Sequence, residues 1–308
     1  MKGLPDDRRI DYLTIPGTHD SAAIGPDPIG LISCQSHDIS YQLAMGMRFL
    51  DIRLGCVKDK LFLFHDFVRL AGDFNETVLA PVLSFLKFYP SEFVIMSIRE
   101  EQQPRECTLQ FQKLLEQVYI SQRPNSWYLK NSVPKLREVR GKIMLVRRFS
   151  GSIGLSTEGW GGNACSGSVH KDSFTLSVQD CYSYNRCGGT KGKINRIGTG
   201  LVLSIQHKAC PFLNISRSQT TPVQWFNFVS LSGRRIPELA RAINPRIWQI
   251  IHNSVAKGCA KGRKCPLNRF GQTFCSLGVL IWNFPFRTLG EDMAKDMIVM
   301  NDFNWAKC

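Results

Sequence analysis

The stretch Ile15-Pro16-Gly17-Thr18-His19-Asp20-Ser21 decides how the rest of this chain is interpreted. It continues a short apolar run at residues 12–14, and the two together predict a β-strand that ends in a tight turn. His19 and Asp20 then lie at the C-terminal end of that strand. In barrels of alternating strands and helices, this end of the strands carries the catalytic groups. Taken alone, the stretch fits equally well a structural turn whose histidine makes a local hydrogen bond.

Two further segments favour a catalytic interpretation. Residues 49–54 predict a strand with Asp51 and Arg53 on one face, because side chains two residues apart on a strand point the same way. Residues 61–66 form another apolar run that contains His65 near its end, and we interpret it as the next strand of the barrel. Two histidines that can exchange acid and base roles beside a fixed cation indicate phosphoryl-transfer chemistry.

Hydrophobic periodicity predicts alternating strands and helices along the rest of the chain. Further strands are expected at residues 93–98, 143–146, 174–179, 225–231 and 278–284. Helices are expected at residues 78–88, 109–119, 236–243, 247–252 and 289–300, with a break at Asn244-Pro245. Residues 201–205 fit a strand or a helix, and residues 255–275 predict a basic, cysteine-rich loop. The eight alternating units predict one α/β domain over residues 1–308, a single TIM-type (β/α)8 barrel.

The motifs resemble a known enzyme family. IPGTHDS, LDIRLG and LFLFHDF together resemble the catalytic X region of phosphatidylinositol-specific phospholipases C of the bacterial, metal-independent type. Residues 96–101, 141–149, 178–182 and 226–230 resemble the later strands of that family, in the right order. The resemblance runs from about Arg9 to the C-terminal helix. It implies a barrel that is distorted or incompletely closed, and it marks residues 255–275 as an insertion.

The resemblance implies an intramolecular first step. The inositol 2-hydroxyl attacks its own 1-phosphate, which releases diacylglycerol from phosphatidylinositol or a glycosyl-phosphatidylinositol lipid and leaves inositol 1,2-cyclic phosphate. His19 would be the base, His65 the acid and Arg53 the phosphate clamp, with Asp20 and Asp51 orienting these three side chains. Histidine suits both roles because its pKa lies near working pH, and the fork of an arginine matches phosphate oxygens.

The same resemblance implies an inositol pocket beside the catalytic groups. Charged side chains would pair with vicinal hydroxyls and an aromatic ring would stack on the sugar; these residues are Arg99, Glu101, Arg148, Asp180 and Tyr182. The alternative is that the charged residues form surface ion pairs and that Tyr182 is a core aromatic.

Arg53 also argues against calcium. The animal signalling enzymes of the superfamily place a carboxylate metal ligand at this position, and a guanidinium cannot ligate a cation. Asp20 likewise stands where those enzymes have an asparagine. We therefore expect neither a metal nor another cofactor.

One position departs from the family pattern. The eighth strand of the family ends in an aspartate that supports the base histidine, and here that residue is Asn283. An asparagine can orient the imidazole but cannot stabilise the imidazolium by charge. The analogous change in serine proteases costs about four orders of magnitude in rate. The alternative function is therefore a weakly active or inactive family member that binds inositol-lipid or acidic head groups at a membrane surface.

The net charge of +14 predicts an anionic partner. Lysine and arginine are spread along the chain and no nucleic-acid motif occurs, so we expect a phosphatidylinositol-containing membrane surface and not nucleic acid. Trp160 and the pair Arg234-Arg235 are candidates for the lipid-facing rim, with core packing as the alternative for Trp160. We expect a monomer.

The 11 cysteines are many for a cytosolic enzyme, and no paired C-x-x-C unit predicts a zinc site. Disulfides are expected within two groups: Cys165, Cys181, Cys187 and Cys210, and Cys259, Cys265 and Cys275. Two N-x-S/T sequons, at residues 75–77 and 214–216, would be used only in a secretory route. We therefore favour a secreted or peripheral-membrane location over a cytoplasmic one.

Overall fold

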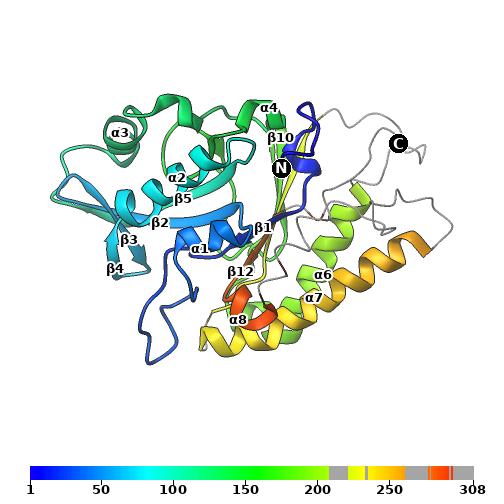
Figure 1. The fold of residues 1–308 in the computed structure, drawn as a ribbon. Coiled ribbons are helices and arrows are strands. Elements are labelled where there is room, and N and C mark those ends of the chain that lie inside the picture. The colour runs from blue at the N-terminus through cyan, green and yellow to red at the C-terminus, as the bar shows by residue number, and fades with distance from the viewer. Residues whose placement is uncertain (208–220, 233–234, 261–276, 278, 291–292, 294–308) are drawn as a thin grey trace.

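A mostly parallel sheet curves into an open barrel (Figure 1). The computed structural model describes residues 1–207, 221–232, 235–260, 277, 279–290 and 293. The main strands are β1 (Ile15–Thr18), β2 (Phe49–Val57), β5 (Val94–Arg105), β7 (Ile143–Arg148), β10 (Phe174–Gln179), β11 (Val223–Phe228) and β12 (Val279–Trp282). They pair in parallel in the order β7-β5-β2-β1-β12-β11-β10. Their carboxyl ends therefore meet at one rim.

The barrel is open between β7 and β10. Beyond β5, β7 pairs only with the short strands β6 (Trp127–Tyr128) and β8 (Leu155–Ser156), as far as the described residues show. On the other edge, β10 pairs in antiparallel fashion with β9 (Gly167–Lys171). No strand of the described part joins the two edges. The expected α/β barrel, distorted and incompletely closed, is confirmed, whereas its organisation as a single domain stays a prediction.

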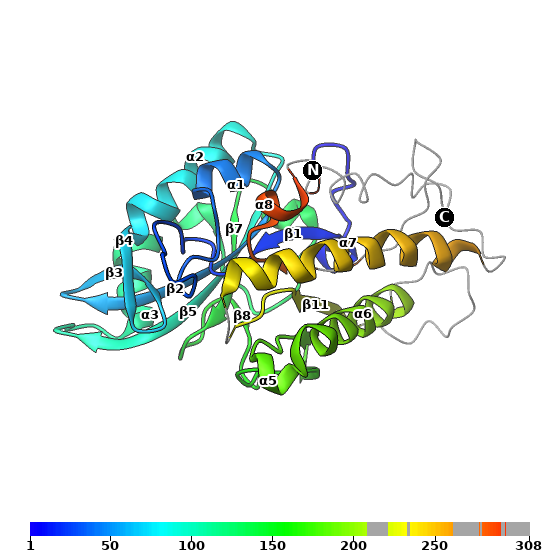
Figure 2. The same ribbon diagram turned by 90° about the horizontal axis from the view of Figure 1, so that it is seen from below.

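Apolar side chains pack on both faces of the strands, as in other parallel sheets. Ile15, Phe49, Ile95, Phe226 and Ile281 fill the interior of the barrel. Outside, α1 (Ile39–Ala44), α2 (Ala80–Phe88) and α3 (Phe111–Leu114) cover β2, β5 and β7. The long helices α6 (Gly189–His207) and α7 (Ile236–Ala260) lie side by side over the C-terminal strands (Figures 1 and 2).

The remaining elements are short and connect this framework. They are η1 (Ile10–Tyr12), β3 (Lys60–His65), β4 (Val68–Asp73), η2 (Asn75–Leu79), η3 (Leu115–Ile120), η4 (Pro124–Ser126), α4 (Leu136–Val139), α5 (Tyr184–Cys187) and α8 (Pro285–Leu289). Among the described residues, no helix is both long enough and apolar enough to cross a bilayer.

The strand that carries His65 is not the parallel barrel strand predicted for residues 61–66. β3 runs antiparallel to β2, and β4 then runs antiparallel to β3. Only Lys58 and Asp59 separate β2 from β3, and both have positive φ angles of 50° and 54°, the conformation of a tight hairpin turn. A parallel connection needs a crossover of a dozen or more residues. The hairpin nevertheless returns His65 to the rim of the barrel.

Predictions about the C-terminal half change at three places, and one open alternative is settled. α7 continues through Pro245, so the predicted break is wrong; this proline lies on an exposed face, where water can solvate the carbonyl group that loses its partner. Residues 255–260, predicted as the start of a loop, belong to α7, and residues 261–276 lie outside the described part. Residues 201–205 belong to α6. α8 ends at Leu289, where a helix was expected to begin, and residues 294–308 again lie outside the described part.

Two disulfides tie loops to the strands. Cys165–Cys181 confirms a disulfide within the first predicted group. Cys56–Cys107, which joins the end of β2 to the segment after β5, was not predicted. Cys34 and Cys187 are free and buried. The predicted partners at positions 210, 265 and 275 lie outside the described residues, and the side chain at position 259 is not described either.

We expect the Cys56→Ser/Cys107→Ser double variant to lose about 3–4 kcal/mol of unfolding free energy. The bond closes a loop with a sequence separation of 51, and removing it restores conformational entropy to the unfolded chain. Urea denaturation of the oxidised proteins measures the loss. Cys187→Ser is the control, because it removes a buried cysteine without opening a loop. An equal loss in both variants would contradict the prediction.

Candidate functional site

Four predicted catalytic residues meet at the rim where β1, β2, β3 and β12 end. His19 follows β1, and its backbone N–H donates a hydrogen bond to the carbonyl of Trp282 (2.8 Å), the last residue of β12. Arg53 belongs to β2, His65 ends β3, and Asn283 follows β12. The side chains of His19, Arg53 and His65 are only 12%, 10% and 10% exposed. The rim therefore holds two imidazoles around one shielded guanidinium.

Asn283 and Arg53 hold His19 from opposite sides. Its Nδ1 lies 2.8 Å from Asn283 Oδ1, and its Nε2 lies 2.7 Å from Arg53 Nη2. The carbonyl oxygen of an amide only accepts and a guanidinium only donates, so Nδ1 carries the hydrogen and Nε2 presents its lone pair. Burial and the charge of Arg53 lower the pKa of His19 to about 3. This neutral tautomer is the one that a general base acting through Nε2 needs.

His65 lies on the other side of Arg53 and faces Asp20. Its Nε2 is 3.6 Å from Asp20 Oδ2, and the same oxygen is 3.3 Å from Arg53 Nε. Asp20 has a φ of 44°, which turns its backbone inward at the end of β1. Burial raises the pKa of Asp20 to about 8, and burial together with Arg53 lowers the pKa of His65. The free thiol of Cys34 lies against this pair.

Three carboxylates fix the guanidinium of Arg53. Asp20, Asp51 and Glu101 have oxygens 3.3, 3.6 and 3.1 Å from its nitrogens. Although burial alone would lower the pKa of Arg53, these carboxylates raise it above its usual range. Asp51 is completely buried, and although burial opposes it, the charges of Arg53 and Arg148 lower its pKa to about 2. Arg53 therefore stays charged and is oriented before any ligand arrives.

The charged residues predicted for the inositol pocket continue this network. Arg148 Nη1 is 3.3 Å from Asp51 Oδ1, and its Nη2 is 3.7 Å from Asp180 Oδ2. Arg99 Nε forms an ion pair with Glu101, 2.9 Å from Oε2. The structure thus brings all four beside the catalytic group, and their roles in binding stay predictions.

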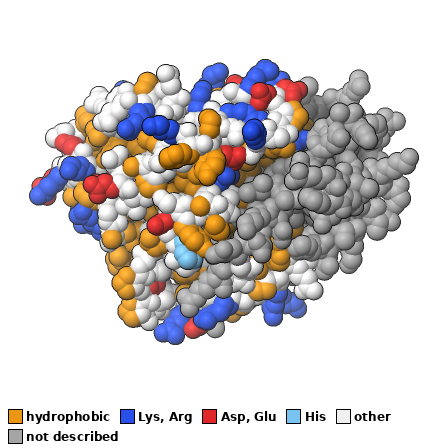
Figure 3. Space-filling model, in the orientation of Figure 1, with side chains coloured by type: hydrophobic (Ala, Val, Ile, Leu, Met, Phe, Trp, Pro, Cys, Tyr) orange, Lys and Arg blue, Asp and Glu red, His pale blue; other side chains and the backbone are white. Residues whose placement is uncertain are grey.

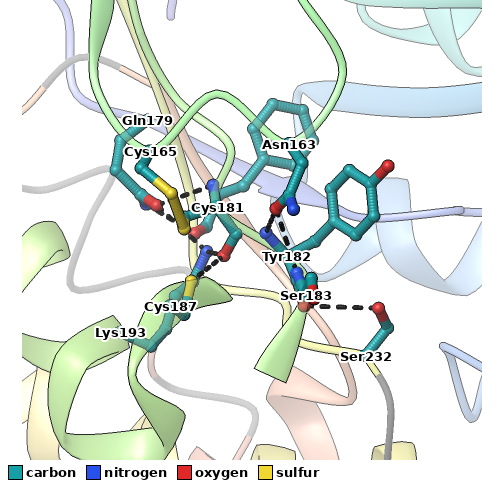
Figure 4. Close-up of a disulfide and its surroundings, with 10 residues drawn as sticks. Asn163, Cys165, Gln179, Cys181, Tyr182, Ser183, Cys187, Lys193 and Ser232 are labelled. Atoms are coloured by element: carbon teal, nitrogen blue, oxygen red, sulfur yellow. Dashed lines mark hydrogen bonds between the residues drawn. A yellow bond between two sulfur atoms is a disulfide. The ribbon is translucent and has the colours of Figure 1, made fainter. Parts of the chain in front are cut away.

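Tyr182 lies apart from the network, one residue after the Cys165–Cys181 disulfide (Figure 4). Its backbone N–H donates to Asn163 Oδ1 at 2.8 Å, which fixes the turn after β10. The residue is 37% exposed, so it is not a core aromatic. Its ring is accessible to a ligand, although no contact joins it to the four charged residues above in the part of the chain that is described.

Sequence reasoning missed two buried polar residues that support the rim. Gln35 Nε2 donates to the carbonyl oxygens of His19 and Trp282, at 2.7 and 2.9 Å. Lys193 is fully buried and donates to Gln179 Oε1 (3.1 Å) and the Cys181 carbonyl (2.7 Å; Figure 4). Burial lowers the pKa of Lys193 to about 8. Gln35 lies in no motif.

A signal for Lys193 was present in the sequence. It precedes Ile197 and Leu201 at intervals of four residues, which is the spacing of one buried helix face.

Trp160 is partly buried and packs against the core. It packs against the interior of the barrel, with its ring 6.0 Å from that of Phe226, and Arg148 lies over it at 4.3 Å. The core alternative is therefore confirmed. Arg235 is exposed near the start of α7, whereas Arg234 lies outside the described residues.

Comparison with known proteins agrees with this geometry. Residues 15–149 match the family described as phosphatidylinositol-specific phospholipase C, X domain. The chain is 30% identical over 198 residues to a 1-phosphatidylinositol phosphodiesterase of Staphylococcus aureus, covering 59% of this chain and 63% of that protein. A Listeria monocytogenes protein of the same name is 32% identical over 156 residues, 47% of each chain. The chain is thus homologous to these bacterial enzymes, and the alignments span less than two thirds of their length.

Solved structures show the same fold. The phosphatidylinositol-specific phospholipase C from Listeria monocytogenes superposes with a TM-score of 0.70 at 22% identity, covering 98% of this chain and 97% of that one. A mutant of the Staphylococcus aureus enzyme gives 0.76 at 24% identity, covering 97% and 95%. The barrel architecture is therefore that of the bacterial phospholipases C.

We expect Asn283→Asp to raise the pKa of His19 by about 1–3 pH units, because a carboxylate beside Nδ1 favours the imidazolium. Imidazole resonances followed by NMR across a pH titration give the value directly. In the parent protein, His19 should stay neutral from pH 8 down to pH 5, since its pKa is about 3. Asn283→Ala serves as the control for loss of the hydrogen bond without a new charge. A His19 pKa that is the same in all three proteins would contradict the assignment.

Proposed function

We propose that the protein is a phosphodiesterase that cleaves phosphatidylinositol, or glycosyl-phosphatidylinositol lipids, to diacylglycerol and inositol 1,2-cyclic phosphate. One observation carries the proposal: Arg53 Nη2 lies 2.7 Å from His19 Nε2, and Asp20 Oδ2 lies between Arg53 and His65, 3.3 Å from Arg53 Nε and 3.6 Å from His65 Nε2. Two imidazoles on either side of one fixed cation are suited to in-line transfer at a phosphate. Homology to bacterial enzymes named for this activity supports the substrate class.

In the proposed first step, the inositol 2-hydroxyl replaces Arg53 as the partner of His19 Nε2. His19 takes the hydroxyl proton as the oxygen attacks phosphorus, and Arg53 binds a non-bridging phosphate oxygen. Protonated His65 gives its proton to the glycerol oxygen as the phosphorus–oxygen bond breaks. The phosphate anion raises the pKa of His65 when the substrate binds, which offsets the lowering by burial and Arg53. One proton is taken and one is given, so neutral diacylglycerol leaves.

The head group would be bound by the residues around this centre. Arg148 and Asp180 form one charged pair, and Arg99 and Glu101 form another. Each pair offers donors and acceptors to adjacent hydroxyls, and Tyr182 offers a flat apolar surface to the ring. Paired charges suit a polyol because each hydroxyl both donates and accepts.

Asn283 supports the second candidate function, a binding protein with little or no turnover. Its Oδ1 holds His19 Nδ1 at 2.8 Å without adding a negative charge. A protein of this kind would keep the inositol pocket and bind the same lipids. Measured turnover separates the two functions.

Phosphorus NMR of phosphatidylinositol micelles tests the reaction. We expect a cyclic 1,2-phosphate signal in the presence of EDTA, since no step of the proposed reaction uses a metal. His19→Ala and His65→Ala should each slow its formation about 10²–10⁴-fold, the usual contribution of one acid or base. Phe88→Ser, far from the rim, is the control. Lipid binding without product in the parent protein would favour the binding function, and product only after calcium is added would contradict the role of Arg53.

Exposed apolar residues beside the site support a membrane partner. Phe67 is 80% exposed and lies two residues after His65, while Ile29 and Leu31 are 56% and 49% exposed in the loop after β1. Leu70 of β4 packs against the apolar cluster that includes Ala23 and Cys34 of that loop, so the hairpin lies near the loop. We name Ile29, Leu31 and Phe67 the apolar rim. The apolar rim lies beside His65, which would protonate the leaving glycerol oxygen. It is therefore on the side from which diacylglycerol would depart.

We expect Phe67→Ser to weaken sedimentation with vesicles that contain phosphatidylinositol by about 10-fold, because a buried phenylalanine contributes about 1.5–3 kcal/mol. The matched control is Phe88→Ser, since Phe88 is 76% exposed at the end of α2, next to the amino-terminal end of β5. Hydrolysis of a short-chain, monomeric substrate should be unchanged in both variants. Equal vesicle binding by Phe67→Ser and Phe88→Ser would exclude the apolar rim as the contact.

The proposal also covers the cellular location of the protein and its oligomeric state. Two disulfides favour a secreted or peripheral-membrane protein over a cytoplasmic one. Lysine and arginine occur at several separate places on the face shown in Figure 3, not in one stripe of the kind that binds nucleic acid. We therefore propose a monomer that works at a phosphatidylinositol-containing surface without nucleic acid.

A further inference from the structure

We infer that Asp20, Cys34 and His65 form an inhibitory site for thiophilic divalent metal ions, of which Zn²⁺ and Cd²⁺ are the fitting class. The inhibition rests on the proposed function, whereas the binding does not. Each residue offers one ligand atom, and the three atoms all lie within 4.8 Å of one another. All three residues are buried. Cys34 has no part in the proposed reaction; it packs in a small apolar cluster, and its Sγ faces the acid and Asp20.

The spacing of the ligand atoms suits a tetrahedral ion. Asp20 Oδ2 and His65 Nε2 are 3.6 Å apart. Bonds of about 2.0–2.2 Å from zinc to nitrogen and oxygen place two ligands of a tetrahedral ion roughly 3.3–3.6 Å apart. The carboxylate and the imidazole therefore already have the separation that zinc requires. The third atom, Cys34 Sγ, lies close enough to complete the set with a small side-chain movement.

Two of the three ligand atoms, Asp20 Oδ2 and Cys34 Sγ, have few hydrogen-bonding partners that a metal ion would have to replace. Within the described residues, Asp20 Oδ2 accepts no hydrogen bond, although the residue is only 1% exposed. Cys34 Sγ makes one long contact, 3.8 Å to the Ile32 carbonyl. An imidazole, a carboxylate and a thiolate are the donor types that zinc prefers, while calcium and magnesium take oxygen ligands. The site therefore selects a thiophilic ion.

Arg53 competes with the metal. Its Nε is 3.3 Å from the same Asp20 oxygen, so an incoming dication must displace or repel the guanidinium. Cys34 binds as a thiolate and Asp20 as a carboxylate, each releasing any proton it holds to solvent, and His65 binds as a neutral imidazole. The metal's two positive charges are thus balanced by the protons that leave. Binding weakens as pH falls, because protons compete for the thiolate, the carboxylate and the imidazole.

Metal binding would remove two parts of the proposed reaction at once. His65 could no longer carry a proton to the leaving oxygen while its nitrogen is bound to the ion. Arg53 would lose Asp20, one of the three carboxylates that orient it. The proposed reaction uses no metal, so occupation of this site can only inhibit it.

Cobalt tests the binding without any need for turnover. Co²⁺ held by a thiolate gives a sulfur-to-metal charge-transfer absorption that EDTA abolishes. We expect the parent protein and Cys187→Ser to show a saturable band that Cys34→Ser lacks. Cys187 is the matched control, because it is the other free, buried cysteine of the described part. Thermal melts check that each variant is folded, and Cys34→Ala replaces Cys34→Ser if the serine variant unfolds. The same band in the Cys34 variants as in the parent would overturn the inference.

Activity provides the second measurement. Turnover in EDTA should be the same for the parent, Cys34→Ser and Cys187→Ser. Added Zn²⁺ should inhibit the parent and Cys187→Ser. Cys34→Ser should need at least ~10-fold more Zn²⁺ for the same inhibition, because even the loss of a residue that only supports a metal ligand lowers metal affinity by about 10–100-fold. Equal inhibition of all three would overturn the inference and leave the proposed function standing. Absence of turnover in every protein would remove the proposed function, and the cobalt band would still decide the metal site.

Discussion

The rim of the barrel depends on one buried guanidinium. Arg53 contacts Asp20, Asp51 and Glu101, and its Nη2 also faces His19. Removing a charge from water costs several kcal/mol unless partners surround it, and each carboxylate here would be equally costly without the arginine. The arrangement therefore holds together as a set. It also orients the cation before a phosphate arrives, which is the condition under which electrostatic stabilisation is most effective.

The fold makes this cluster possible by bringing strand ends together. β1, β2 and β12 are parallel neighbours, so residues that follow or end them share one rim. Asp51 and Arg53 lie two residues apart on the same face of β2. Asp20 follows β1 with a φ of 44°. Arg148 extends the network from β7 and Asp180 from the turn after β10, on the two edges that the open barrel leaves unjoined. An ion pair thus connects edges that no backbone ladder joins in the described part.

The sequence predicted the site residues that lie at the ends of strands. It did not predict the residues that only tertiary contacts bring to the site. His19, Arg53 and Asn283 were foreseeable because parallel strands place their carboxyl ends together. His65 reaches the predicted place through a hairpin with a two-residue turn at Lys58 and Asp59, not through the parallel crossover that was predicted. Gln35 and Cys34 belong to no motif, and only the folded chain brings them to the rim, whereas Lys193 shares the four-residue spacing of a buried helix face. Cys56–Cys107 joins residues far apart in sequence, a pairing that spacing alone cannot give.

With Asn283 in place of an aspartate, another carboxylate must balance the positive charge of protonated His19. When His19 accepts a proton at Nε2, an aspartate at Nδ1 would stabilise the imidazolium, and Asn283 supplies only the hydrogen bond at 2.8 Å. Asp51 is the nearest substitute, with Oδ2 at 3.9 Å from Nε2, on the side where the proton arrives. A carboxylate at this distance typically raises the pKa of an imidazole by about 1–3 pH units. Arg53 opposes it, and in the proposed reaction a bound phosphate would offset the charge of the guanidinium. Asp51 would then favour protonation of His19 most when the substrate is bound.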